Sequence, residues 1–227
     1  SEFPFFPGAQ AAIAFASSGS AGELIAVRSG FLHSSDIDPQ KPINWKRQAQ
    51  YCGRAGVMND LGMHAWHVPL RLGWHPVSLS AQLQDLVPFR PGPDGAEVPC
   101  DTWENASIHA ELAGSGILDV RVDRIAPGNM NTWYFEVTGM AGGARFSTAD
   151  PKRIQVLHQA PSYGGGMQMA WQAIEVGSQS VWPTVTGGIF ETGFSDAILQ
   201  MWAAFLAERA GALGDRFEDE PGMAGRG

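Results

Sequence analysis

Three stretches of the chain alternate strictly between apolar and polar residues, and this pattern constrains the fold more than any other feature. They lie at residues 106–112, 118–123 and 132–137. Because successive side chains of a β-strand point to opposite faces, each stretch predicts a strand with one apolar and one polar face. Three such strands in close order indicate an antiparallel sheet, and its apolar face requires a cover.

Two predicted helices could supply that cover. An alanine-rich stretch from Gly8 to Ser18 favours a short helix. A second helix is expected from about Gly56 to Leu72, where Pro69 should kink or shorten the last turn. A third, at residues 194–210, is amphipathic, and its aromatic residues favour a place in the core. The sequence thus predicts an α+β fold, with an open, predominantly antiparallel sheet and helices on one face.

The segments between these elements divide into strands and loops. Residues 23–32 and 77–87 predict strands, and residues 142–157 predict a turn followed by one strand. Three segments lack an apolar period and are predicted to be loops or connections: residues 34–55, 88–99 and 163–166. Long loops inside compact domains often carry function. We expect one domain over residues 1–227, with a core at about 5–210 and a frayed tail at 211–227.

Composition limits the classes of partner. The chain is 44% hydrophobic and has eight tryptophans, enough for a sizeable core. Its formal charge of −8 and the lack of a Lys/Arg cluster argue against nucleic acid or an anionic membrane. Cys52 and Cys100 lie far apart, which fits a reducing cytoplasm better than a disulfide framework. With no apolar run of about 18 residues and no signal-peptide pattern, we expect a soluble, cytoplasmic protein with small-molecule ligands.

The segment Asp60-Leu61-Gly62-Met63-His64 is the most informative chemical motif. In a helix, residues four apart lie one above the other, roughly 6 Å apart, so Asp60 could orient and charge-stabilise His64. An imidazole, with a pKa of about 6.5, can move a proton to and from a substrate hydroxyl near neutral pH. Alternatively, Asp60 could complement the helix dipole and His64 could be a core histidine. The spacing alone leaves both interpretations open.

Phosphate-binding loops are missing from the sequence. It contains no Gly-x-Gly-x-x-Gly and no Gly-Lys-Ser/Thr segment, so it predicts no nucleotide site of its own. It also lacks the Gly-x-Ser-x-Gly elbow of serine hydrolases. We therefore expect no cofactor to bind this chain alone.

Five segments, taken in order, carry a family resemblance. They are Phe6–Gln10, Gly22–Arg28, Trp45–Arg47, Asp60–His64 and Trp133–Gly139. From about residue 5 to 210, the chain resembles the C-terminal domain of the glucose-fructose oxidoreductase/inositol dehydrogenase (Gfo/Idh/MocA) family. The resemblance implies a fold of the dihydrodipicolinate-reductase-like type. It also implies a preceding Rossmann domain, absent here, that binds NAD or NADP in the full-length protein.

The resemblance also implies roles for individual residues. His64 would be the acid–base residue for a hydroxyl of a sugar, cyclitol or related polyol, and Asp60 would be its partner. A lysine of the Rossmann domain would join them, and it has no match in this chain. The chain would then be the substrate-binding domain of an NAD(P)-dependent dehydrogenase, inactive by itself.

Further candidate substrate-binding residues are Trp45, Lys46, Arg47 and His67. The first three occupy the loop that approaches the substrate in relatives, where a cation would suit sugar hydroxyls or a carboxylate. Their alternative is a solvated basic turn with Trp45 packed beneath it. His67 stands where many relatives carry aspartate, and its alternative is a surface or supporting position.

Two other functions stay open, a non-catalytic dimerisation or carbohydrate-binding module and a metal site built from Asp60, His64 and His67. No third neutral ligand is obvious, so we predict no metal. The polar face of the sheet is too charged to be buried dry, and family members often associate through it, so we expect a wet homodimer interface there. Its residues are His109, Glu111, Asp119, Arg121, Asp123, Tyr134 and Glu136.

Overall fold

An eight-stranded sheet forms the centre of the computed structural model, which describes residues 1–176, 179–188 and 190–211. Its strands run in the order β10-β9-β8-β7-β1-β6-β5-β2. Within the described residues, neighbouring strands are antiparallel except for the parallel pair β1 and β6. This confirms the predicted open, predominantly antiparallel sheet. The strands are β1 Leu24–Leu32, β2 Pro76–Gln84, β5 Asn105–Leu112, β6 Ile117–Asp123, β7 Thr132–Gly139, β8 Gly143–Ser147, β9 Arg153–Pro161 and β10 Met167–Glu175.

Strand β1 corrects the predicted neighbourhood of the three alternating strands. β5 pairs with β6 as expected, but β7 does not follow β6 in the sheet. β1 lies between them, where Val27 is paired with Leu118 on one side and with Val137 on the other. All three side chains are buried, so an apolar strand from the N-terminal part of the chain completes the centre of the sheet.

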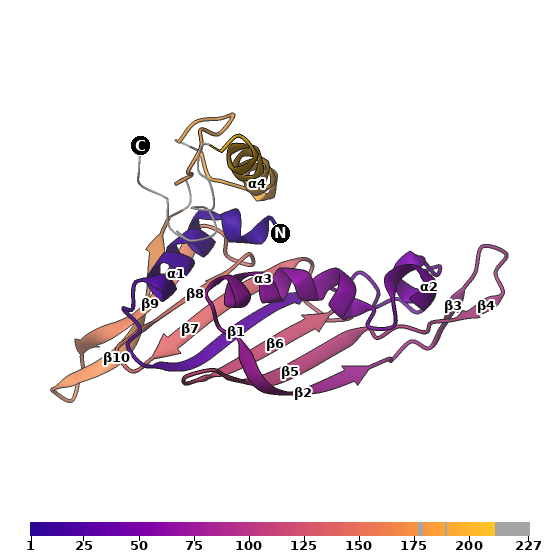
Figure 1. The fold of residues 1–227 in the computed structure, drawn as a ribbon, viewed down its shortest axis with the longest axis horizontal. Helices are drawn as coiled ribbons and strands as arrows, with labels where there is room; N and C mark the ends of the chain where they lie inside the picture. Colours follow the sequence, from indigo (N-terminus) through magenta and orange to yellow (C-terminus); the bar gives the residue numbers. More distant parts are fainter. Residues whose placement is uncertain (177–178, 189, 212–227) are drawn as a thin grey trace.

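Helices cover one face of this sheet (Figure 1). α1 (Pro7–Ser17) packs on β8, and α3 (Met63–Arg71) packs on β1. Glycine allows α1 a close approach, because a Cβ built on Gly8 would lie 2.3 Å from the ring of Phe146. The two helices enclose a core in which Trp133 and Phe135 are fully buried. The predicted cover of the apolar face is thus confirmed.

Ordered elements occur in segments predicted to be loops. Residues 34–55 contain a 3₁₀ turn, η2 (Trp45–Arg47), and a short helix, α2 (Ala49–Cys52). Residues 88–99 contain a small hairpin, formed by β3 (Phe89–Pro91) and β4 (Glu97–Pro99).

Beyond residue 142 the sheet is larger than predicted. The single strand expected at 142–157 is two strands, β8 and β9, and the following β10 was not predicted. Most side chains of β10 are exposed, so no sustained alternation of apolar and polar residues marks this strand.

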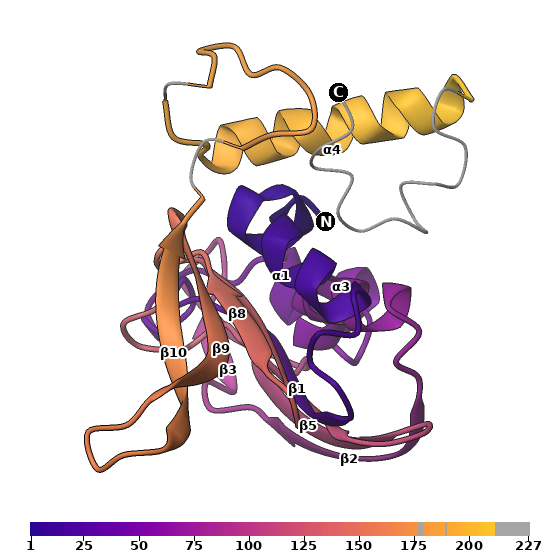
Figure 2. The ribbon, with the colours of Figure 1, turned by 90° about the vertical axis from the view of Figure 1, so that its left-hand side faces the viewer.

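The last helix, α4 (Phe194–Arg209), is confirmed as a helix, but its predicted core position is wrong. Figure 2 shows α4 beyond α1, away from the sheet. It contacts the short 3₁₀ helix η1 (Phe3–Phe5) and buries Ala197, Gln200 and Ala204, while Trp202 is 53% exposed. The buried residues of α4 are thus two alanines and a glutamine, whereas Trp202 and Phe205 of the aromatic stripe are exposed. The predicted tail lies outside the described residues from 212 onward.

Candidate functional site

The segment that carries Asp60 and His64 is held firmly against the sheet. Pro69 lacks an N–H group and leaves the carbonyl of Ala65, four residues earlier, without its helical donor. The hydroxyl of Ser29, buried in β1, donates to that carbonyl at 2.7 Å. Trp133 Nε1 donates to the carbonyl of His64 at 2.9 Å. The proline thus helps to dock α3 on the sheet, and the helix continues to Arg71.

Asp60 does not lie in the regular helix that the spacing predicted. It belongs to a π-helical turn, η3 (Met58–Gly62), which leads into α3. Such turns change the angle between residues four apart, so Asp60 and His64 need not stack as in an α-helix. Among the described residues, no hydrogen bond or ion pair joins the two side chains.

The ring of His64 is partly buried in an aromatic setting. It lies edge-on to Phe3 and Phe31, with centroid distances of 5.3 and 5.2 Å. Its Nδ1 is 3.1 Å from Ser1 Oγ and 4.0 Å from Glu2 Oε2, whereas Nε2 has no partner among the described residues. Burial lowers the pKa of His64 below its ordinary value, against the opposing effect of Glu2. A neutral imidazole with an available Nε2 can accept a proton.

The carboxylate of Asp60 is engaged by two cations. Its Oδ2 is 3.0 Å from Lys46 Nζ and also accepts a hydrogen bond from Arg124 Nη2. Burial works to raise the pKa of Asp60, but Arg124 and Lys46 outweigh it and hold that pKa below the ordinary value. Asp60 is therefore a fixed negative charge at neutral pH, and it acts to raise the pKa of nearby His64.

The three residues of η2 differ in exposure. Trp45 is 51% exposed, and Lys46 Nζ lies 5.5 Å from the centre of its ring. Arg47 is fully buried, with Nη2 at 3.0 Å from Glu104 and 3.1 Å from Asp85. This burial argues against the predicted contact between Arg47 and a substrate. The observed turn also differs from the alternative, a solvated basic turn with Trp45 packed beneath it. Arg47 ties the turn to the sheet, and Trp45 is exposed.

Two further histidines lie near this cluster. His67 is partly buried, one turn along α3 from His64, and burial lowers its pKa to about 4. His33 lies just beyond β1, and its Nδ1 shares a hydrogen bond of 2.8 Å with Ser35 Oγ. Burial and the charge of Arg124 lower the pKa of His33 to about 4. The sequence predicts no role for His33 or Arg124. Each residue follows the end of a strand, and no local motif surrounds it.

Thermal stability should decrease as the pH falls from about 6.5 towards 4. A histidine whose pKa is lower in the folded state binds fewer protons there than in the unfolded chain. Its stabilising contribution is complete above the unfolded pKa of about 6.5 and is lost as the pH falls to the folded value. His33→Gln should flatten the plot of Tm against pH in this window, and His158→Gln, at an exposed site in β9, should not. A slope unchanged by His33→Gln would contradict the assignment.

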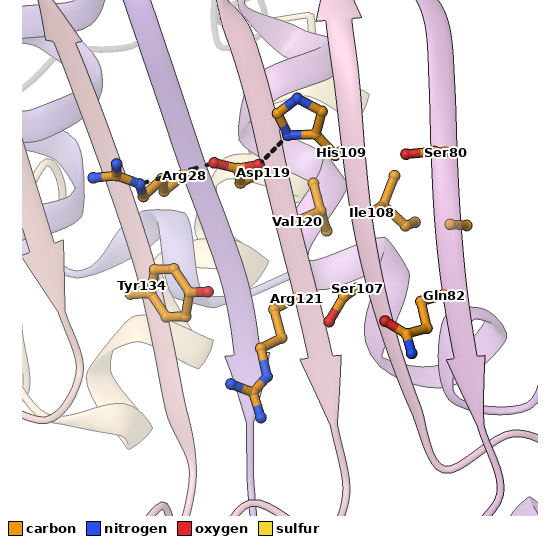
Figure 3. Close-up of a pocket in the computed structure, with 11 residues that line it drawn as sticks. Arg28, Ser80, Gln82, Ser107, Ile108, His109, Asp119, Val120, Arg121 and Tyr134 are labelled. Atoms are coloured by element: carbon orange, nitrogen blue, oxygen red, sulfur yellow. Dashed lines mark hydrogen bonds and ion pairs between the residues drawn. The ribbon is translucent and has the colours of Figure 1, made fainter.

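None of the described helices lies on the opposite face of the sheet (Figure 1), and Figure 3 shows residues that line a pocket there. A concavity of about 630 Å³ lies over β1, β2, β5, β6 and β7. Arg28 Nη1 is 2.6 Å from Glu136 and its Nε is 3.9 Å from Asp119, which also contacts His109 Nδ1 at 2.6 Å. Of the predicted polar-face residues, Asp123 departs from expectation, since it is almost fully buried and paired with Arg121.

Several classes of site can be checked against the described part of the chain. No three His, Cys, Asp or Glu side chains there lie close enough to bind one metal ion. Cys52 and Cys100 are both buried free thiols. In the same residues, no helix has the length and apolar character needed to cross a membrane.

Comparisons with known proteins agree with the resemblance seen in the sequence. A family model described as the GFO/IDH/MocA C-terminal domain matches residues 9–145. Levoglucosan dehydrogenase from Pseudarthrobacter phenanthrenivorans is 24% identical over 151 residues, which cover 61% of this chain and 38% of that protein. The chain thus spans well under half of this relative.

Solved structures show the same fold. Levoglucosan dehydrogenase in complex with NADH and L-sorbose has a TM-score of 0.77 at 21% identity, covering 92% of this chain and 56% of that one. An inositol dehydrogenase homolog complexed with NAD+, from Azotobacter vinelandii, has a TM-score of 0.67 at 19% identity, covering 94% and 54%. The family model matches more than half of the chain, and on this basis the chain belongs to the GFO/IDH/MocA family as a C-terminal domain.

Proposed function

We propose that this chain is the substrate-binding domain of a nicotinamide-dependent dehydrogenase that acts on a sugar, cyclitol or related polyol. The observation that carries the proposal is a partly buried His64 with a lowered pKa and an available Nε2, on the segment that also holds the Asp60–Lys46 pair. Relatives of similar fold include a dehydrogenase in complexes with NADH and L-sorbose and with NADH and levoglucosan. Both carbohydrates carry hydroxyl groups of the kind that a neutral imidazole can deprotonate.

Each side chain has a distinct part in this proposal. His64 Nε2 accepts the proton of the reacting hydroxyl, and the negative charge of Asp60 stabilises the imidazolium that forms. Lys46 donates hydrogen bonds to substrate oxygens, while the exposed ring of Trp45 packs against the C–H face of the carbohydrate. Arg47 holds the turn that carries both, and His67 supports α3 behind His64.

A nucleotide site does not fit the described residues. None of their helices begins after a glycine-rich strand–helix turn, the arrangement that holds a pyrophosphate. We therefore assign NAD or NADP to a preceding Rossmann domain, where the nicotinamide would accept the hydride. We also infer that the protein is cytoplasmic, because a reducing compartment keeps thiols such as those of Cys52 and Cys100 free.

The full-length protein should reduce NAD or NADP when supplied with a suitable sugar or cyclitol. The 227-residue chain alone should neither bind the nucleotide nor oxidise the polyol. Calorimetric titration of this chain with each nucleotide should give no micromolar binding, because the pyrophosphate has no site. Spectroscopic detection of NADH or NADPH with a panel of polyols tests the full-length protein. Tight nucleotide binding by this chain, or no turnover of any polyol by the full-length protein, would count against the proposal.

A homodimer through the open sheet face is the second part of the proposal. The hollow there is lined by charges of both signs, those of Arg28 and Arg121 and that of Asp119, which suit a self-complementary wet interface around a two-fold axis. This feature also supports the alternative of a non-catalytic dimerisation module. The dehydrogenase and the non-catalytic module can be distinguished, since only the dehydrogenase requires His64.

Association should weaken as salt rises from about 0.05 to 0.5 M, because charge pairs at the interface are screened. Arg28→Glu should shift light-scattering mass towards the monomer by placing a third carboxylate beside Glu136 and Asp119. Arg54→Glu is a matched control, since Arg54 is exposed in the segment between α2 and η3, which is not part of the sheet. A strict monomer at high protein concentration and low salt would exclude this dimer.

A further inference from the structure

A buried arginine stands behind the Asp60 carboxylate. The side chain of Arg124 is 1% exposed, and Asp60 Oδ2 is its hydrogen-bond acceptor. Its Nε and Nη1 are buried without a hydrogen-bond partner in the described structure. Buried donors without acceptors cost free energy, so a cation kept in this setting calls for an explanation.

The backbone of Arg124 is fixed from two sides. It follows the last residue of β6, and its N–H donates to the carbonyl of Glu104 at 3.1 Å. Its own carbonyl accepts from the N–H of Asp36, also at 3.1 Å. The guanidinium thus projects from a rigid point of the sheet, which suits a group that must hold another side chain in place.

Both cations bind the same oxygen of Asp60. Arg124 and Lys46 contact Oδ2, whereas Oδ1 accepts no hydrogen bond from the described residues. Lys46 is one-third exposed and Arg124 is not, so of the two only Lys46 can reach a ligand from solvent. The arrangement leaves one carboxylate oxygen and one ammonium available at the same place.

We propose that Arg124 is a positioning residue of the dehydrogenase site, which rests on the function proposed above. It holds Asp60 through Oδ2, so that Oδ1 is left to accept a hydrogen bond from a substrate hydroxyl and Lys46 stays beside it. Arg124 itself does not touch the substrate. The other groups whose charges interact with Asp60 are His33, Cys52 and His64, and none of them supplies a second buried cation.

The first test follows the titration of Asp60 by ¹³C NMR of its carboxyl group in this chain. In Arg124→Met, which keeps the apolar stem, the midpoint should rise, because a cation that favours the carboxylate has been removed. In Arg124→Lys, which keeps the charge, the midpoint should stay near the wild-type value. Arg153→Met removes an exposed cation on β9 and should leave the Asp60 titration unchanged.

The second test measures kinetics in the full-length protein with a polyol that the wild type oxidises. Arg124→Met should lower kcat/KM by roughly 10²-fold, the loss expected from a misplaced catalytic group, and Arg124→Lys should recover part of it. The effects of Arg124→Met and Asp60→Asn should not add, since both act through one carboxylate. If the role of Arg124 were purely structural, Arg124→Met would lower stability, and its kinetic effect would add to that of Asp60→Asn.

The outcomes separate the two levels of the proposal. An Asp60 midpoint unchanged in a folded Arg124→Met protein, or additive kinetic losses, would overturn the positioning role while leaving the dehydrogenase proposal intact. If the methionine variant does not fold, Arg124→Lys decides the matter: a partial loss of kcat/KM is expected, and a full wild-type kcat/KM would overturn the positioning role of the guanidinium. A wild-type protein that oxidises no polyol would overturn the function itself, whatever the titration shows.

Discussion

Replacing His64 by alanine in the full-length protein should lower turnover by roughly 10²- to 10⁴-fold, the range typical of a positioned general base. The imidazole is held neutral by burial between Phe3 and Phe31, and its Nε2 is available for a substrate proton. The loss should appear in kcat, measured as nicotinamide reduction under saturating polyol. The pH profile of the residual turnover should lack the acidic limb of the wild-type profile, because the group that must be deprotonated is gone.

His158→Ala is the matched control for this substitution, since His158 is exposed on β9 and its loss should leave turnover unchanged. Circular dichroism should show both variants folded. A His64→Ala protein that retains wild-type turnover, or that unfolds while His158→Ala does not, would favour the interpretation of His64 as a core histidine.

Asp60→Asn should have the second-largest effect, because it affects both catalysis and stability. Asparagine removes the charge that stabilises the imidazolium and leaves the buried guanidinium of Arg124 without its anion. Removing one partner of a buried ion pair costs roughly 3–5 kcal/mol, and partial exposure of Asp60 reduces this to about 2–3 kcal/mol here. We expect turnover to fall at least tenfold and the midpoint of urea unfolding to decrease.

Asp38→Asn serves as the control for Asp60→Asn, because the exposed Asp38 carboxylate accepts only from the backbone of Gln40 in the described structure. It should change the free energy of unfolding by less than about 0.5 kcal/mol. Equal stability of the two variants would show that Arg124 does not depend on Asp60. Full turnover by a folded Asp60→Asn protein would remove Asp60 from the proposed site.

The strongest strand signal in the sequence comes from strands with one buried and one polar face. The alternation in β5, β6 and β7 follows directly from burial of one face. β10 lacks this signal because most of its side chains are exposed. The insertion of β1 between β6 and β7 depends on which strands pair across the chain, and no local pattern encodes such a choice.

The same distinction applies to the candidate site. Asp60 and His64 lie four residues apart and can be found by spacing, as can Trp45 and Lys46 through their family resemblance. Arg124 lies 64 residues from Asp60 in sequence, and its role depends on the sheet bringing the end of β6 under the π-helical turn. The sequence also could not show that Arg47 is buried, because that burial depends on Glu104 just before β5 and on Asp85 after β2.

The central place of β1 has a consequence for how the chain folds. β1 spans residues 24–32, yet its two partners are β6 and β7, which end at residues 123 and 139. During synthesis, β1 therefore has to wait for most of the chain before it can pair on either side. Contacts this distant in sequence make folding slow, because the entropy of a long loop is lost before any pairing compensates for it. Since α3 is docked on β1 through Ser29, the site and the sheet should be acquired in a single late step.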